Sequence, residues 1–187
     1  MCRFEDMIKA AKDNKMMACA ATEHGNMYSA VEFHTAMSHA GIKPILGLET
    51  YIVDDIKNNQ RKKNHLVLLV KNEIGWNNLI QISSYAFTDG FYYKPTIDKP
   101  FLKEHSEGLI ALSSCVQGEV PSKLISDDFE GAKKSAEEYL SMFKEGNYYL
   151  EIQNHGLEEE LLANRGLREL SKSLSIPLVA TNDVHYM

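Results

Sequence analysis

The sequence has few cysteines, no basic excess and no long apolar run, and each shortage excludes a class of protein. Its three cysteines, Cys2, Cys19 and Cys115, are odd in number and widely spaced among 187 residues, which excludes a disulfide scaffold and fits reduced thiols. The formal net charge of -6 excludes a module that holds nucleic acid by bulk electrostatic attraction. No run approaches the ~18 apolar residues of a membrane span, and the N-terminus lacks a signal-peptide core. We therefore expect a cytoplasmic protein without a membrane partner.

The remaining composition is that of an ordinary globular protein. Hydrophobic residues make up 44% of the chain and charged residues 25%. The length allows one domain with a sizeable core, and no linker, low-complexity segment or internal repeat divides it. We therefore predict a single domain over residues 1–187.

Six short apolar runs alternate with segments of helical periodicity. The strand candidates are residues 16–21, 44–53, 65–70, 109–112, 148–152 and 177–181. A helix is expected after the third run. It is followed by a predicted turn and aromatic loop from Asp89 to Asp98, which precedes the fourth run. This alternation predicts an α/β domain with a parallel sheet, and on pattern alone both a doubly wound sheet and a β/α barrel stay open.

Potential ligands fall at the ends of several predicted strands. His24 follows the first run, Glu49 interrupts the second, and Cys115 follows the fourth. Asp183 and His185 follow the last run and are separated by one residue, so in extended backbone their side chains would share a face. The carboxyl ends of strands are where α/β folds place their chemistry, so these groups are expected to converge.

This set of groups suits a multinuclear zinc or manganese site. Nitrogen and sulfur ligands favour zinc, while carboxylates bridge metals and balance charge. Close-set metals activate water and stabilise phosphoryl displacement, so the set suggests metal-assisted phosphoester hydrolysis. His65 and His155 lie near other strand ends. Each residue alone also has an ordinary explanation, Cys115 as a small core residue, for example, and His24 as a turn residue.

Several sequence motifs occur in the order that a known family shows. They are Thr22-Glu23-His24-Gly25-Asn26-Met27, Gly41-Ile42-Lys43-Pro44-Ile45-Leu46-Gly47-Leu48-Glu49, His65-Leu66-Val67-Leu68-Leu69-Val70-Lys71-Asn72, Gly90-Phe91-Tyr92-Tyr93-Lys94-Pro95, Glu107-Gly108-Leu109-Ile110-Ala111-Leu112-Ser113 and Ala180-Thr181-Asn182-Asp183-Val184-His185-Tyr186. Together they closely resemble the polymerase-and-histidinol-phosphatase (PHP) domain that begins the alpha subunit of bacterial DNA polymerase III. The resemblance covers nearly the whole chain.

The resemblance implies a fold, a site and an activity. It implies a distorted, TIM-barrel-like barrel of seven β/α units, of which this chain would supply six strands. It also implies divalent metals, zinc or manganese with magnesium as a further candidate, and a metal-activated water as the nucleophile. Relatives with an intact site are associated with 3′ to 5′ exonuclease activity, and pyrophosphatase activity has been proposed for them. The positions that match metal ligands are His24, Glu49, His65, Cys115, Asp183 and His185.

Two departures from the family pattern affect the expected metal occupancy. The family opens with a strand ending in His-x-His, and nothing before Phe4 supplies these residues. Glu23 stands where the family usually has Asp, and the longer carboxylate would orient His24 from a shifted position. We therefore expect an incomplete metal site, and exposed strand edges that favour self-association.

The sequence is compatible with three functions. The resemblance implies a fragment of the replicative polymerase, whose partners are the rest of the alpha subunit and primed DNA, and whose nucleotidyltransferase carboxylates would lie beyond Met187. The second reading is an inactive structural module that stabilises the polymerase and docks a proofreading exonuclease. The third is a free-standing phosphatase acting on a small phosphate ester, although the aromatic stretch at Phe91 to Pro95 favours the polymerase branch.

Overall fold

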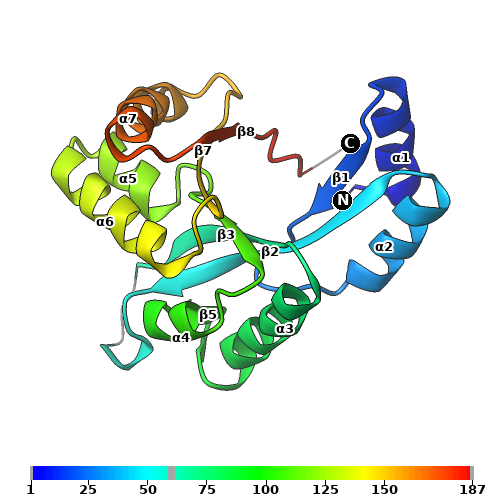
Figure 1. Ribbon diagram of the computed structural model, residues 1–187, viewed down its shortest axis with the longest axis horizontal. Coiled ribbons are helices and arrows are strands. Elements are labelled where there is room, and N and C mark those ends of the chain that lie inside the picture. The colour runs from blue at the N-terminus through cyan, green and yellow to red at the C-terminus, as the bar shows by residue number, and fades with distance from the viewer. Residues whose placement is uncertain (1, 59–61, 186–187) are drawn as a thin grey trace.

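The computed structural model describes residues 2–58 and 62–185, which are built around a curved mixed sheet (Figure 1). Its strands are β1 (Ala18–Ala21), β2 (Lys43–Val53), β3 (Asn64–Val70), β4 (Phe91–Tyr92), β5 (Lys94–Asp98), β6 (Leu109–Leu112), β7 (Tyr148–Ile152) and β8 (Leu178–Ala180). Their order is β4-β5-β2-β3-β6-β7-β8, and β1 pairs with β2. All six predicted runs form strands, and the α/β, barrel-like class is confirmed.

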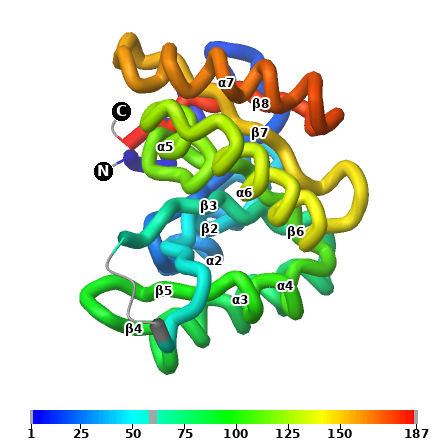
Figure 2. Tube along the Cα trace, turned by 90° about the vertical axis from the view of Figure 1, so that its left-hand side faces the viewer, coloured from blue at the N-terminus to red at the C-terminus, as the bar shows by residue number. Residues whose placement is uncertain are grey.

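Helices cover the outside of this sheet. They are α1 (Phe4–Asp13), α2 (Ala30–His39), α3 (Glu73–Thr88), α4 (Lys99–Glu104), α5 (Glu119–Ile125), α6 (Phe129–Met142) and α7 (Glu158–Leu174), with a 3₁₀ turn η1 (Ile56–Asn58). Helices α5, α6 and α7 pack together on one side, whereas α1 and α2 pack against each other beside β1 (Figures 1 and 2). No helix among the described residues is long and apolar enough to cross a membrane.

Side-chain caps begin three of these helices. Asn72 accepts a hydrogen bond from the Gly75 amide at 3.0 Å, which starts α3. Asp128 accepts one from the Gly131 amide at 2.9 Å at the start of α6, and Asp98 caps α4 in the same way. Each carboxylate or amide oxygen satisfies an amide that has no partner inside its helix.

Strand β2 organises the sheet because both of its edges are occupied along most of its length. Its first half pairs in parallel with β1, and its last three residues pair in parallel with β5 on the same side. The opposite edge pairs with β3. A Cβ atom at Gly47 would lie 2.6 Å from the Leu68 carbonyl oxygen, so only glycine permits this close approach between β2 and β3.

The prediction of a wholly parallel sheet is wrong at β3. This strand runs antiparallel to both β2 and β6. The connection from β2 to β3 covers only residues 54–63, and its described part forms the short turn η1, whereas a parallel return needs a longer crossover, usually a helix. As a result His65, at the start of β3, pairs with Tyr51 near the carboxyl end of β2.

The expected loop from Asp89 to Asp98 is also wrong in part, because it contains the hairpin β4–β5. Phe91 pairs with Pro95 and Tyr92 with Lys94, which leaves Tyr93 in the turn with a φ of 60°. Pro95 argues against a central strand but is tolerated at a sheet edge, where this hairpin lies. A turn without glycine or asparagine gave no hairpin signal.

Two apolar cores stabilise these layers. The larger lies between the sheet and helices α3 to α7, and its fully buried members include Leu48, Leu68, Leu79, Ile82, Ile97, Leu109, Tyr139, Leu150 and Leu167. The smaller joins α1 and α2 to the start of β2 through Ala11, Phe33, Met37 and Ile42. Neither core contains a candidate metal ligand. Packing and site chemistry therefore use different residues among those described.

A buried ion-pair network holds α4, α5 and α6 together. The Lys99 ammonium lies 3.0 Å from Glu119 and 2.7 Å from Glu138. Glu119 also accepts hydrogen bonds from Ser135 at 2.6 Å and from Tyr139 at 2.9 Å. Burial by itself would raise the pKa of Glu119, but these hydrogen bonds and the neighbouring lysines lower it to about 2.

We predict that Glu119→Gln lowers the free energy of unfolding by about 3 kcal/mol, because it removes the buried charge that faces Lys99. Urea unfolding monitored by circular dichroism measures the change. The matched control is Glu137→Gln, an exposed position on α6, for which we expect a change within about 0.5 kcal/mol. Equal stabilities of the two variants would contradict a structural role for the network.

The same network predicts an acid-dependent loss of stability. Because the folded pKa of Glu119 (about 2) lies below its ordinary value of 4.5, its contribution is complete above pH 4.5 and is lost as the pH falls toward 2. The melting temperature of the parent should therefore fall more steeply than that of Glu119→Gln between about pH 5 and about pH 3. Parallel melting curves over this interval would count against the assignment.

Unpaired strand edges predict self-association. Within the described residues β1 pairs only with β2, and β8 pairs only with β7, so each presents a free edge. We expect sedimentation velocity to show dimers or larger species whose fraction rises with protein concentration. A compact monomer at every concentration would show that these edges are protected.

Candidate metal centre

The carboxyl end of β1 and the middle of β2 bring the first two candidate ligands together. Beyond β1, His24 forms a parallel bridge with Glu49. The Gly25 amide donates to the Glu49 carbonyl at 2.8 Å, and the Glu49 amide donates to the Glu23 carbonyl at 3.0 Å. These backbone bonds extend the β1–β2 pairing past the strand end and aim both side chains at the same edge.

Glu49 lies between two imidazoles. Its carboxylate oxygen Oε1 is 3.1 Å from His65 Nδ1, and Oε2 contacts His24 Nδ1. One ligand atom from each of His24, Glu49 and His65 lies within 4.8 Å of the others. Glu49 and His65 are each only 5% exposed, whereas His24 reaches solvent. The three therefore form a cluster with a buried floor and an open side.

The loop after β6 adds Cys115 and Ser114 to this cluster. The Cys115 Sγ atom lies 3.7 Å from His65 Nδ1 and 4.0 Å from Glu49 Oε1. Ser114 has a φ of 65°, and its hydroxyl donates to Glu49 Oε1 at 2.8 Å. The left-handed backbone at Ser114 turns the chain so that successive side chains both reach the cluster.

These contacts shift the pKa of both buried partners. Burial alone would raise the pKa of Glu49, but the hydrogen bond and charge of His65 lower it below its ordinary value. Burial would lower the pKa of His65, whereas hydrogen bonds with Cys115 and Glu49 raise it to about 9. A metal needs the free lone pair of an imidazole, so metal loading at neutral pH must release a proton from this cluster.

Asp183 and His185 lie at the open side of the cluster. The His185 ring stacks against the His24 ring with a centroid separation of 5.3 Å, and its Nε2 lies 3.4 Å from Asp183 Oδ1. They do not extend a strand, because β8 ends at Ala180 and Asp183 has a φ of 41°. The contact between Asp183 and His185 therefore depends on the change of backbone direction at Asp183 and not on extended backbone. Tyr186 and Met187 lie outside the described residues.

The sequence suggested that Glu23 would orient His24. In the structure its carboxylate accepts a hydrogen bond from the Ser29 amide at 3.0 Å, at the start of α2. The contact places a negative charge where the helix dipole favours one. Glu23 thus stabilises the turn that follows His24. Its carboxylate accepts a hydrogen bond at the start of α2 and does not orient the His24 ring.

The donors present fit a divalent metal. Two imidazoles, a shared carboxylate and a nearby thiol are the ligand types that zinc accepts, and a carboxylate with two oxygens can bridge two ions. A hydroxyl bond from Ser114 orients that carboxylate, as outer-shell partners do in metal sites. A bound metal would supply an activated water and charge stabilisation for phosphoester hydrolysis.

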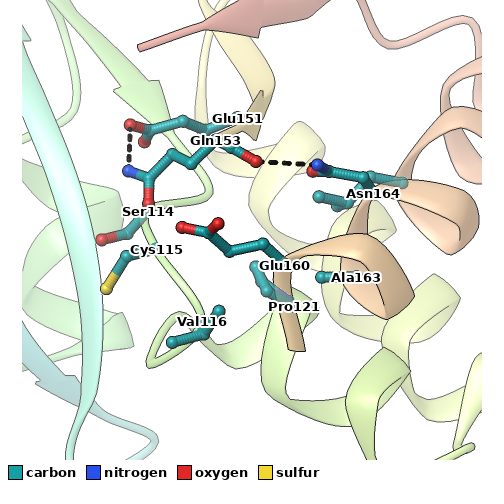
Figure 3. Close-up of a pocket in the computed structure, with 10 residues that line it drawn as sticks. Ser114, Cys115, Val116, Pro121, Glu151, Gln153, Glu160, Ala163 and Asn164 are labelled. Carbon is teal, nitrogen blue, oxygen red and sulfur yellow. Dashed lines mark hydrogen bonds between the residues drawn. The ribbon is translucent and has the colours of Figure 1, made fainter. Parts of the chain in front are cut away.

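The sequence reasoning missed Glu151, a second buried carboxylate near this edge. It lies at the carboxyl end of β7, is 5% exposed, and lines a small pocket with Ser114, Cys115 and Gln153 (Figure 3). Its Oε1 accepts hydrogen bonds from Gln153 and Thr181, but its Oε2 has no hydrogen-bond partner. A carboxylate inside an apolar run, the signal that identified Glu49, would also have identified Glu151.

The environment of Glu151 favours its neutral form. Burial raises the pKa of Glu151, and the negative charges of Asp183 and Glu49 raise it further. Hydrogen bonds from Thr181 and Gln153 lower this pKa, but the net shift is upward. A proton or a cation would satisfy the unpaired oxygen. Because it shares a pocket with Ser114 and Cys115, Glu151 is a further candidate residue at this edge of the sheet.

Comparison with known proteins identifies the family. The PHP domain family matches residues 1–155. DNA polymerase III subunit alpha from Treponema pallidum is 42% identical over 98% of this chain and 16% of its own length. The same subunit from Thermus aquaticus is 38% identical over 99% of this chain and 16% of its own length. The chain thus spans about one sixth of these curated relatives.

A solved structure shares the fold. A protein from Bifidobacterium adolescentis, described as a metal-dependent phosphoesterase, superimposes with a TM-score of 0.59 and 14% identity over 99% of this chain and 83% of that chain. At this identity the likeness concerns the fold alone, and it confirms the expected PHP, TIM-barrel-like architecture. With the family match over residues 1–155, these findings show that the chain belongs to the PHP domain family.

Proposed function

We propose that this chain acts as the PHP domain of a replicative DNA polymerase III alpha subunit in the cytoplasm and carries a divalent-metal phosphoesterase centre. The observation that carries the proposal is the convergence of ligand atoms from His24, Glu49 and His65 within 4.8 Å. The relatives' name, DNA polymerase III subunit alpha, supports the polymerase context. Cys115, Asp183 and His185 complete the proposed ligand set.

The chain's own residues account for binding and orientation at such a centre. Glu49 offers two oxygens, and the bond from Ser114 fixes their direction. The Tyr51 ring lies beside His24 and His65, with centroid distances of 6.5 and 5.0 Å. The Lys94 ammonium lies 4.3 Å from the centre of that ring, where its charge would attract a phosphate.

The proposed reaction is hydrolysis of a phosphodiester at a DNA 3′ end, with pyrophosphate as the second substrate to test. A metal held by His24, Glu49 and His65 would supply an activated water for phosphoester cleavage, and we assign to Lys94 the attraction of the phosphate. The rest of the polymerase, primed DNA and the proofreading exonuclease are the proposed partners. A bound metal is zinc or manganese in this proposal, with magnesium as the alternative.

The structural-module function has one observation in its favour. Among the described residues only His24, Glu49 and His65 form a ligand group of three, and Asp183 and His185 remain at the rim. A site of this kind would bind metal weakly and serve mainly to stabilise the polymerase. Metal affinity and hydrolysis, measured together, separate the two functions.

We predict that Glu49→Gln abolishes hydrolysis and weakens metal binding, because it removes the charge shared by two imidazoles. The expected changes are at least a tenfold loss of Mn²⁺ or Zn²⁺ affinity by calorimetry and about a 100-fold or larger loss of cleavage of end-labelled primed DNA. Asp183→Ala combined with His185→Ala should give a similar loss of cleavage.

The matched control is Glu145→Gln, an exposed carboxylate in the α6–β7 loop, which should behave as the parent. Circular dichroism checks that each variant keeps its fold. If the parent and Glu49→Gln cleave DNA and pyrophosphate at the same rate, the hydrolytic function is wrong. A folded parent that binds neither metal would leave the structural module as the better account.

A further inference from the structure

The loop after β7 contains a histidine whose two ring nitrogens are both engaged. His155 Nδ1 lies 2.6 Å from Glu160 Oε1, and His155 Nε2 lies 2.6 Å from the carbonyl oxygen of Asn182. The His155 amide also donates to Glu160 Oε2 at 2.6 Å. Glu160 is 4% exposed in the first turn of α7. A buried carboxylate therefore holds this ring against the residue that precedes Asp183.

The partners of this ring determine its proton count. A carbonyl oxygen only accepts hydrogen bonds, so Nε2 must carry a proton, and the ionised Glu160 requires a second proton on Nδ1. Hydrogen bonds to Glu160 and to the Asn182 carbonyl accordingly raise the pKa of His155. Since neither nitrogen keeps a free lone pair, His155 is not placed as a metal ligand, although its position near a strand end had suggested one.

Four contacts anchor the chain immediately before Asp183. The Thr181 amide donates to the Ile152 carbonyl at 3.2 Å, and the Thr181 side chain contacts Glu151 and Gln153. The next residue, Asn182, is held by His155. The backbone then turns at Asp183, where φ is 41°. The direction in which Asp183 and His185 leave this turn depends on where the Asn182 carbonyl is held.

We propose that His155 and Glu160 form a clamp that positions Asp183 and His185 over the metal centre, with His155 as a positioning residue that touches neither metal nor substrate. The clamp links the start of α7 to the segment after β8. This proposal rests on the proposed function insofar as Asp183 and His185 are ligands. The clamp itself is defined by the three short contacts of the His155 residue.

The clamp predicts a loss of metal affinity that a single amide donor can reverse. His155→Ala should weaken Zn²⁺ binding by the purified chain about 10- to 100-fold, as loss of an outer-shell partner does in metal sites. His155→Gln should recover most of that affinity, because the glutamine amide can donate to the Asn182 carbonyl. The control His34→Ala, at an exposed position on α2, should bind Zn²⁺ as the parent does. Isothermal titration calorimetry measures all four proteins.

A metal-free measurement tests the clamp independently of the proposed function. Order parameters from ¹⁵N relaxation should fall for the amides of residues 182–185 in His155→Ala and stay at parental values in His34→Ala. The imidazole ¹⁵N shifts of His155 in the parent should show both nitrogens protonated at neutral pH.

The outcomes separate the two proposals. Unchanged order parameters in His155→Ala, or a neutral His155 ring in the parent, would overturn the clamp whatever the metal results are. A parent that binds no Zn²⁺ but shows the loss of order in His155→Ala would overturn the proposed metal centre and leave the clamp standing. Equal Zn²⁺ affinity of the parent and a folded His155→Ala would overturn the positioning role.

Discussion

A carboxylate buried inside a sheet needs partners, and Glu49 has His24, His65 and Ser114 within contact distance. The favourable charge interaction with an imidazolium outweighs the loss of hydration, and the pKa of Glu49 is therefore lowered. Each partner comes from a different element, so the position of this one side chain depends on the correct pairing of β1, β2, β3 and the loop after β6. The candidate metal centre exists only when those pairings form.

Three buried carboxylates differ in the groups that surround them. Glu119 faces Lys99 and has a pKa lowered to about 2, which makes it a permanent charge within a structural network. Glu49 faces imidazoles, whose protons a metal can replace. Glu151 has only a hydroxyl and an amide as donors, so burial dominates and its pKa is raised. The partners thus separate residues that stabilise the fold from residues that are available for chemistry.

The direction of β3 has the largest consequence for the site. In an antiparallel strand the first residues lie at the edge where the parallel strands end, so His65 reaches the same edge as His24. The hairpin β4–β5 extends the sheet on the other side of β2 and places Lys94 over the Tyr51 ring. The site therefore combines residues from parallel and antiparallel parts of one sheet.

The sequence by itself determined most of the elements and most of the candidate ligands. Apolar runs located six strands, because this signal depends on neighbours within a few residues. The carboxylate inside the apolar run of β2 singled out Glu49, although the same signal at Glu151 was overlooked. The family resemblance added His65 to the set before any geometry explained its place.

Only the tertiary structure decided strand direction, the hairpin at Phe91 to Pro95, and the partners of each ionisable group. Strand direction depends on pairing between segments far apart in the sequence, and the short connection through η1 forces β3 to reverse. Glu23 bonds Ser29 and His155 bonds Glu160 and Asn182 for the same reason. A side chain's hydrogen-bond partner is set by the three-dimensional position of its backbone, and residue type alone does not specify it.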